Sequence, residues 1–146
     1  MTREEKELVI RDLSARIPYD TWVRIEIYID HRDRGNYLRT VATSDILLDG
    51  YTLDDYNEGD AKSIKAYLRP MSSMTEEEEK EFNMIVGYKG ESNDGWTICD
   101  NIHTRWGVWV LGCSEMIDWL NKHHFDYRGL IPKGHALEAP EDMYNN

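Results

Sequence analysis

The stretch WVRIEIYI, at residues 22–29, constrains the fold of this chain more than any other part of the sequence. Two sets of side chains alternate along it, one apolar and one mixed: the first is Val23, Ile25, Ile27 and Ile29, and the second is Trp22, Arg24, Glu26 and Tyr28. Successive side chains of a β-strand point to opposite faces of a sheet, so this alternation predicts a strand with one buried face.

Three other stretches have the start signals and the apolar spacing of amphipathic helices. The residues that can cap their N-termini are Thr2 with Glu5, Thr75 with Glu78, and Ser114. In a capping box, the hydroxyl and the carboxylate satisfy backbone N–H groups that would otherwise lack partners at the helix start. Pro18 should end the first helix, because a proline disfavours helical geometry in the residue before it.

The remaining patterns predict further strands and turns. Alternation in SIKAYL predicts a strand over residues 63–68, and YRGLI at 127–131 predicts a last strand. The Asp-Gly dipeptide at 49–50 stands between two apolar triplets, which is typical of a tight β-hairpin turn. We expect a polar turn in HRDRGN at 31–36 and a loop in the acidic stretch at 54–60.

The predicted helices and strands do not alternate strictly along the chain. We therefore predict an α+β fold with a mostly antiparallel sheet and about three helices. A chain of 146 residues can bury a core without disulfides or metals, and no repeat or linker divides it. A single domain over residues 1–146 is expected.

Charge and cysteine usage bear on partners and location. With 17 basic and 28 acidic residues the net charge is −11, which opposes binding to nucleic acid or to an anionic membrane, since both require basic residues to neutralise phosphate. Cys99 and Cys113 are too few for a disulfide framework, and neither a leader nor a long apolar run is evident. We expect a cytoplasmic protein with no nucleic-acid or membrane partner.

Three segments carry a resemblance to a known family: LVIRDLSARIPY, IKAYLRPMSSMTEEEEKEF and WLNKHHFDYRGLIPKGHALEAPEDMY. They resemble segments of a family of small uncharacterised proteins encoded by gut anaerobic bacteria and by their phages and mobile elements. Residues 30–60 and 87–112 depart from the family's pattern, and Ser14 stands where the family has a cysteine. The resemblance implies association with a phage or mobile element, but the family has no assigned activity and transfers no catalytic role.

The histidine-rich stretch at 119–140 raises the question of a metal site. The side chains with suitable ligand atoms are His123, His124, Asp126 and His135. Adjacent residues of a helix point about 100° apart, so His123 and His124 cannot readily hold one ion together. We favour His123 on the apolar face of a helix, with His124 or Asn121 completing the last helical turn, where the dipole favours imidazole. Neither a metal site, nor catalytic residues, nor a cofactor is predicted.

The aromatic residues favour an interface or a ligand pocket, because nine Tyr and five Trp outnumber two Phe. The candidate binding residues are Trp22, Arg24, Tyr28, His124, Asp126 and Arg128. The first three share one strand face, which could offer a stacking surface with a cation. Asp126 and Arg128 would share a face if their segment is extended. The alternative is that a helix covers the aromatic face and makes it part of the core.

Two functions of different classes remain open. The first is a non-enzymatic binding or regulatory protein that contacts a host protein through an acidic and aromatic surface. The alternative is a binder of a nucleotide-like small molecule, which requires a concave pocket lined by Trp or Tyr with one or two arginines. Enzymatic activity is not expected, because no set of catalytic side chains has a spacing that converges on one cleft. The sequence gives no prediction of oligomeric state.

Overall fold

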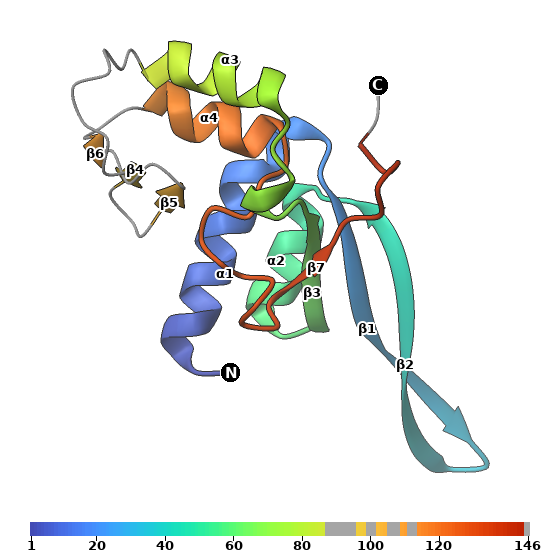
Figure 1. Cartoon of the computed structure of the whole chain (residues 1–146). Coiled ribbons are helices and arrows are strands. Elements are labelled where there is room, and N and C mark those ends of the chain that lie inside the picture. The colour runs from blue at the N-terminus through green and yellow to red at the C-terminus, as the bar shows by residue number, and fades with distance from the viewer. Residues whose placement is uncertain (87–95, 99–101, 105–108, 111–113, 145–146) are drawn as a thin grey trace. The chain divides into compact units, whose positions relative to one another are not determined.

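The structure is a computed structural model that describes residues 1–86, 96–98, 102–104, 109–110 and 114–144 (Figure 1). The helices are α1 (Arg3–Arg16), α2 (Gly50–Glu58), α3 (Glu76–Val86) and α4 (Ser114–Lys122), with the short 3-10 helices η1 (Ile17–Tyr19) and η2 (Met71–Ser73). The strands are β1 (Trp22–Asp33), β2 (Asn36–Leu47), β3 (Ala61–Leu68), β4 (Trp96–Ile98), β5 (Ile102–Thr104), β6 (Trp109–Val110) and β7 (Ala136–Glu138). The predicted α+β class is confirmed, with four α-helices in the described residues where about three were expected.

The strand β1 lies inside a four-stranded sheet with the order β2-β1-β3-β7. It pairs antiparallel with β2 over twelve residue pairs and with β3 over five, so the predicted strand and its antiparallel pairing are confirmed. The polar turn expected at 31–36 is shorter than predicted: Arg34 and Gly35, both with positive φ, connect β1 to β2, and residues 31–33 belong to β1. A smaller sheet has the order β5-β4-β6.

The chain folds into two compact units. The N-terminal unit comprises Met1–Tyr67 and His135–Leu137, and the C-terminal unit comprises Leu68–Gly134 and Glu138–Asn146. Two units of this kind can belong to one domain, so the single domain over 1–146 stays a prediction. None of the described helices is both long and apolar enough to cross a lipid bilayer.

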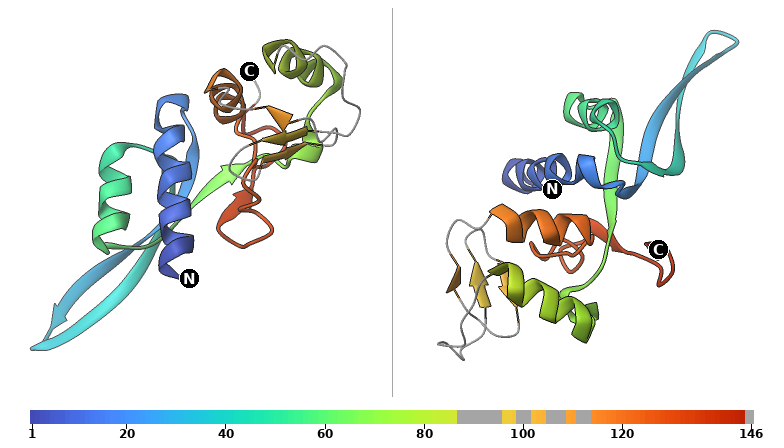
Figure 2. Two further views of the ribbon diagram at one scale, coloured as in Figure 1. Left: turned by 90° about the vertical axis from the view of Figure 1, so that its left-hand side faces the viewer. Right: turned by 90° about the horizontal axis from the view of Figure 1, so that it is seen from above.

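In the N-terminal unit, α1 and α2 cover one face of the sheet (Figure 2). The register places Val23 opposite Ala66 and Ile25 opposite Ile64, and all four side chains are buried. The two helices contribute the buried residues Val9, Leu13, Leu53 and Tyr56. The apolar set of the alternating stretch is thus a core face only in its first half, because Ile27 is already 37% exposed where β1 runs on beyond the helices.

Two of the three predicted helix starts are present as reciprocal hydrogen bonds, whereas the cap predicted at Ser114 involves a side chain that the structure does not describe. Before α1, the Glu5 N–H donates to Thr2 Oγ1 at 3.1 Å and the Thr2 N–H donates to the Glu5 carboxylate at 2.6 Å. Thr75 and Glu78 make the same pair of bonds before α3, both at 3.1 Å. The helix α1 ends two residues before Pro18, as the sequence predicts, but the expected reason is wrong, because Ile17 keeps helical dihedral angles (φ −51°, ψ −44°) and Pro18 lies within η1.

The hairpin turn predicted at 49–50 is wrong, because this dipeptide begins α2. The Asp49 carboxylate accepts a backbone N–H of the first helical turn at 2.8 Å. Aspartate and glycine are common both in turns and at helix N-termini, and the burial of Leu53 and Tyr56 at helical spacing decides between them here. The loop predicted at 54–60 is corrected for the same reason, since most of that stretch belongs to the helix.

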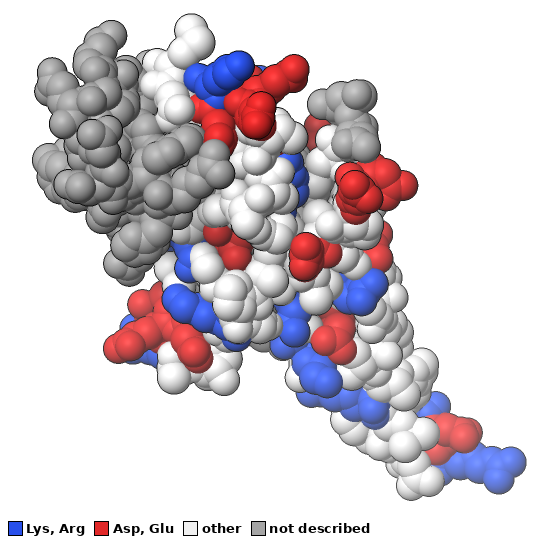
Figure 3. All heavy atoms as spheres, in the orientation of Figure 1, with Lys and Arg blue, Asp and Glu red and all other residues white. Residues whose placement is uncertain are grey.

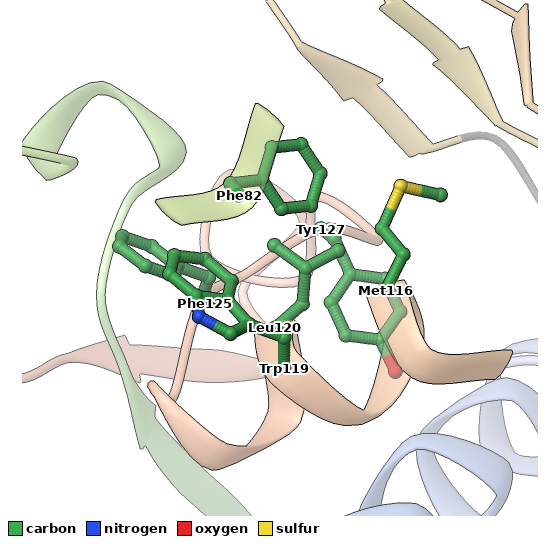
Figure 4. Close-up of a cluster of buried hydrophobic side chains, with 6 residues drawn as sticks. All are labelled: Phe82, Met116, Trp119, Leu120, Phe125 and Tyr127. Atoms are coloured by element: carbon green, nitrogen blue, oxygen red, sulfur yellow. The ribbon is translucent and has the colours of Figure 1, made fainter. Parts of the chain in front are cut away.

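The core of the C-terminal unit is rich in aromatic residues and joins α3, α4 and the segment after α4 (Figure 4). Its buried side chains are Phe82, Met116, Trp119, Leu120, Phe125 and Tyr127. The ring centre of Trp119 lies 5.3 Å from that of Phe82 and 5.8 Å from that of Phe125. Contacts between rings at such distances add to the free energy gained by burial of their apolar area.

The last strand predicted at 127–131 is wrong. This segment consists of turns, and the last strand is β7. The reason is Asp126, whose carboxylate accepts the N–H groups of Leu130 and Ile131 at 2.7 and 2.9 Å. A short acidic side chain that binds nearby backbone N–H groups competes with strand pairing for the same donors.

Helix α1 contains two arginine–carboxylate pairs with the same spacing but opposite environments. Arg16 Nε lies 2.8 Å from Asp12 Oδ2, and both side chains are fully buried. Arg3 Nε lies 3.0 Å from Glu7 Oε1, and both side chains are mostly exposed. Removal of one partner from a buried ion pair leaves a charge that water cannot solvate, whereas an exposed partner is readily solvated.

The Asp12→Ala substitution should therefore lower the free energy of unfolding by about 3–5 kcal/mol. The matched Glu7→Ala substitution should change it by about 0.5 kcal/mol or less. Denaturant unfolding followed by circular dichroism measures both values. Equal effects of the two substitutions would contradict the different burial of the two pairs.

Candidate functional site

The six residues predicted to bind a partner or ligand divide equally between the two units. Those in the N-terminal unit are Trp22, Arg24 and Tyr28, and those in the C-terminal unit are His124, Asp126 and Arg128. They form two local groups, and the contacts of each group show what its side chains do.

Trp22, Arg24 and Tyr28 share the face of β1 opposite its buried face, as the alternation predicts. Arg24 donates to Asp45 on β2 through Nε at 3.0 Å and Nη2 at 3.3 Å. The Arg24 guanidinium carbon also lies 5.6 Å from the ring centre of Tyr67. The cation that was expected to meet a ligand is therefore held by a carboxylate of the neighbouring strand.

Two further charges of this face, Asp30 and Arg39, are also paired within the sheet. The hydrogen bond to Asp45 raises the pKa of Arg24, and the same contact lowers the pKa of Asp45. Arg39 Nε lies 2.9 Å from Asp30 Oδ1, and the Arg39 guanidinium carbon lies 4.7 Å from the ring centre of Tyr28. A phosphate ligand of Arg24 or Arg39 would have to displace the carboxylate paired with it, which weakens the nucleotide-binding hypothesis at these two residues.

His124 connects the end of α4 to neighbouring segments through backbone and ring contacts. Its backbone is left-handed, with φ of 63°, and its N–H donates to the Asn121 C=O at 3.1 Å. Its own C=O accepts the Arg69 N–H at 2.7 Å, and its ring stacks on Tyr144 with ring centres 3.6 Å apart. These contacts agree with the helix-end interpretation, and they give His124 a positioning role toward Tyr144.

Asp126 and Arg128 do not meet the condition for the shared face that was predicted, because residues 126–128 are not extended. Asp126 is buried and uses both carboxylate oxygens to hold backbone N–H groups. Arg128 is half-buried, with its guanidinium carbon 5.1 Å from the ring centre of Tyr127. Within the part of the chain that the structure describes, no three His, Cys, Asp or Glu side chains are grouped to hold a metal ion. Cys99 and Cys113 lie outside that part.

The C-terminal unit contains a groove of about 1050 Å3. One part of its lining is Arg69, Pro70, Ser73, Thr75, Glu77 and Glu78, and the other part is Glu138, Ala139, Pro140, Glu141 and Tyr144. The two parts are joined where the Ala139 N–H donates to the Leu68 C=O at 2.8 Å. We name it the acidic groove, since it holds four glutamates and one arginine, and Figure 3 shows acidic side chains along the C-terminal segment.

The arginine of the acidic groove is fully engaged by one of the glutamates. Arg69 Nη1 donates to Glu78 Oε2 at 2.8 Å, and Nη2 donates to Glu78 Oε1 at 2.7 Å. Burial alone would raise the pKa of Glu78, but hydrogen bonds from Arg69 and Thr75 outweigh it, and the pKa is lowered. This paired geometry is the strongest arrangement available to an arginine and a carboxylate.

The remaining carboxylates of the acidic groove face solvent. Glu77, Glu138 and Glu141 are exposed, and Tyr144 is half-buried beside His124. The groove therefore presents uncompensated negative charge next to an aromatic ring. Such a surface attracts cationic groups and repels anions.

Sequence reasoning did not find this groove. The glutamates at 76–79 are expected at any solvated helix start, and nothing local connects them with Glu138, Glu141 or Tyr144. One signal was available in the sequence: Arg69 and Pro70 end a strand shortly before the acidic start of a helix. A cation at that place needs a carboxylate partner, which the helix start can supply.

Comparison of the chain with protein-family models, with curated proteins and with solved structures gives no match. The resemblance to the family of phage and mobile-element proteins thus stays a prediction. The function is argued below from the geometry of the chain itself.

The contacts of Asp126 can be tested as a structural feature. The Asp126→Ala substitution leaves two backbone N–H groups without acceptors, so the free energy of unfolding should fall by about 2–4 kcal/mol. The matched Asp118→Ala substitution, at an exposed position of α4, should change it by about 0.5 kcal/mol or less. Urea unfolding measures both values. An unchanged stability of the Asp126 variant would show that its carboxylate does not hold the turn and is open to a ligand.

The burial of His123 predicts an acid-sensitive fold. Its ring lies 4.1 Å from the ring of Trp119, and burial lowers its pKa below the usual value of 6.5. The unfolded chain therefore takes up this proton at a higher pH than the folded chain does. The stabilising contribution is complete above pH about 6.5 and is lost as the pH falls toward the folded pKa.

The His123→Gln substitution should reduce the fall in melting temperature between about pH 7.5 and 5.5 by about half. The matched His31→Gln substitution, at an exposed position of β1, should leave that fall unchanged. The corresponding loss from Glu78 begins below its usual pKa of 4.5, so this pH range separates the two groups. An undiminished acid effect in the His123 variant would rule out this histidine as its source.

Proposed function

We propose that the chain is a non-enzymatic binding protein of a phage or mobile element that contacts a host protein through the acidic groove. The observation that carries the proposal is the charge of this groove, in which four glutamates meet one arginine that is already paired. The ligand with complementary chemistry is a basic, extended segment of a partner protein, with lysine or arginine side chains beside the three open carboxylates.

The shape of the acidic groove supports a polypeptide rather than a small molecule. A small ligand typically binds in a pocket that buries most of its surface. Here Glu77, Glu138 and Glu141 are exposed at a groove whose volume of about 1050 Å3 reaches the upper end of the usual range for small-ligand sites. An open groove with a half-buried Tyr144 and two prolines suits an extended chain that remains partly solvated.

The charge of the groove argues against the nucleotide-like ligand. A phosphate-binding site needs a free arginine or lysine, or backbone N–H groups that converge on the anion. Both terminal nitrogens of Arg69 donate hydrogen bonds to Glu78, and the other groove carboxylates would repel a phosphate. The small-molecule alternative therefore lacks the cation that its chemistry requires at this site.

The proposal predicts that neutralisation of the open carboxylates weakens binding of a basic peptide. The variant combines Glu77→Gln, Glu138→Gln and Glu141→Gln. Three lost ion pairs at about 0.5 kcal/mol each correspond to about a tenfold rise in Kd. Fluorescence anisotropy with a labelled peptide of alternating lysine and alanine, read at low ionic strength, measures this change.

The control variant carries the same change in net charge at exposed positions of the N-terminal unit: Glu4→Gln, Asp54→Asn and Glu58→Gln. It should raise the Kd by about twofold or less, since only long-range attraction is reduced. Equal weakening by both variants would show that the attraction belongs to the whole acidic surface. Tighter binding of ATP than of the basic peptide, lost in the groove variant, would establish the small-molecule alternative instead.

A further inference from the structure

Strand β2 is a long open edge of the sheet. Its twelve residues pair with β1 on one side, and the sheet order β2-β1-β3-β7 leaves its other side as an edge. Natural edge strands are usually short, or carry lysine, proline or a bulge that prevents pairing with another chain. The sequence NYLRTVATSDIL contains no lysine or proline, and its register with β1 is continuous. Its two charged side chains, Arg39 and Asp45, form ion pairs with residues of β1.

Among the described strands, none pairs with the far half of the β1–β2 hairpin as a third strand. Pairing of β1 with β3 ends at Ile27, whereas pairing with β2 continues to Asp33 at the turn. Figures 1 and 2 show the hairpin running on past α1, α2 and β3. A two-stranded ribbon is at best marginally stable in water, so this arm gains from an additional strand.

Exposed apolar side chains gather on the same hairpin. Among the described residues eight large hydrophobic side chains are exposed, and five of them belong to β1 or β2: Ile27, Tyr37, Leu38, Val41 and Leu47. Tyr37 and Leu38 are 58% and 52% exposed. By the register, Ile27 and Leu38 lie on one face of the hairpin and Tyr37, Val41 and Leu47 on the other, so each face offers apolar side chains to a neighbouring strand.

The turn geometry determines which backbone groups of β2 are open. Arg34 and Gly35 form a two-residue turn, so Asp33 and Asn36 are the pair next to it, and such a pair exchanges both of its backbone hydrogen bonds. Every second pair along the ladder does the same. The N–H and C=O groups that point away from β1 therefore belong to Tyr37, Arg39, Val41, Thr43, Asp45 and Leu47.

We infer that β2 pairs antiparallel with β2 of a second copy of this chain, about a twofold axis at Ala42, which joins the two sheets into one of eight strands. The strand is complementary to itself in this register. Arg39 faces Asp45 of the second copy, and Tyr37 faces Leu47 of the second copy. Leu38 faces Ile46, Thr40 faces Ser44, and Val41 faces Thr43. Opposite charges and matched apolar pairs across two strands each favour pairing.

The second copy also supports the unsupported arm. In this register residues 37–41 of each copy pair with residues 43–47 of the other, so the far half of each arm lies along the near half of its partner. The charges extend into a row across four strands: Asp30 and Arg39 of one copy, then Asp45 and Arg24 of the other. Each charge in this row has neighbours of opposite sign.

Neighbouring registers lack this match. The open N–H and C=O groups of β2 belong to its odd-numbered residues. Two copies can therefore pair only in registers that place odd residues opposite odd residues, and in these registers the twofold axis passes through a residue. An axis at Val41 places Tyr37 opposite Asp45 and Leu38 opposite Ser44. An axis at Thr43 places Val41 opposite Asp45 and Arg39 opposite Leu47. Both oppose apolar side chains to polar ones.

The distribution of charge favours a second copy over a strand from another protein. Residues 22–47 contain four basic and four acidic residues, so the whole net charge of −11 lies outside the hairpin. Two copies of so acidic a chain repel over most of their surface, and the hairpin is a neutral region where they can approach. The inference does not rest on the acidic groove, which belongs to the other unit.

The first test is the molar mass of the full chain in solution by light scattering at up to about 100 μM, which is well above a micromolar Kd. We expect a dimer. In the Thr43→Pro variant the proline removes an outward N–H and leaves the bonds to β1 intact, so we expect a monomer with an unchanged circular dichroism spectrum. A monomeric unmodified chain, or a dimer that persists in the folded variant, would overturn the inference.

The second test locates the axis without relying on a destabilising change. Ala42 faces its own copy in a pair with Cα atoms about 4.5 Å apart, so Ala42→Cys should form a disulfide between copies on mild oxidation. The matched Thr40→Cys should not, because its two copies lie about 14 Å apart along the strand. Mass spectrometry of peptides separates this bond from any that involve Cys99 or Cys113. Equal cross-linking at positions 40 and 42 would contradict the register.

Discussion

The contact between Arg69 and Glu78 fixes the geometry on which the acidic groove depends. The backbone of Arg69 makes two hydrogen bonds to the segment after α4: its N–H donates to the His124 C=O at 2.7 Å, and its C=O accepts the Asp126 N–H at 2.8 Å. Its guanidinium binds the first turn of α3 and lies 4.3 Å from the ring centre of Phe125 in the core. One residue thus connects a strand end, a helix start and the aromatic core. Because the guanidinium of Arg69 is paired with Glu78, it does not neutralise the other carboxylates of the groove.

Features that depend on residues close together in the sequence could be predicted, whereas features that depend on tertiary contacts could not. Strand β1 and the capping boxes at Thr2 and Thr75 depend on residues a few positions apart, so local patterns identify them. The Asp-Gly pair at 49–50 satisfies the requirements of a hairpin turn and of a helix start equally well, and only the burial of the following helical face decides. Sequence patterns carry no information on such tertiary choices.

Candidate binding residues were hardest to predict, because their availability depends on partners distant in sequence. Arg24 has the right chemistry for an anionic ligand, yet Asp45 on the next strand neutralises it. Asp126 has the right chemistry for a metal or a cation, yet it holds backbone N–H groups. The acidic groove consists of two segments that only the fold brings together, and its glutamates look like an ordinary solvated helix start until Glu138 and Glu141 stand beside them.

The two proposed surfaces act through different physics, and the proposed dimer offsets the weak binding of a single groove. Exposed ion pairs contribute little individually and are screened by salt, so one acidic groove alone binds a basic segment weakly. Strand pairing through β2 uses backbone hydrogen bonds and apolar contacts, which screening affects little. A dimer carries two grooves, and a partner with two basic segments that can reach both gains about 10²–10⁴-fold in avidity without any new contact. In the two proposals together, pairing through a neutral hairpin brings two charged grooves of an acidic chain into one molecule.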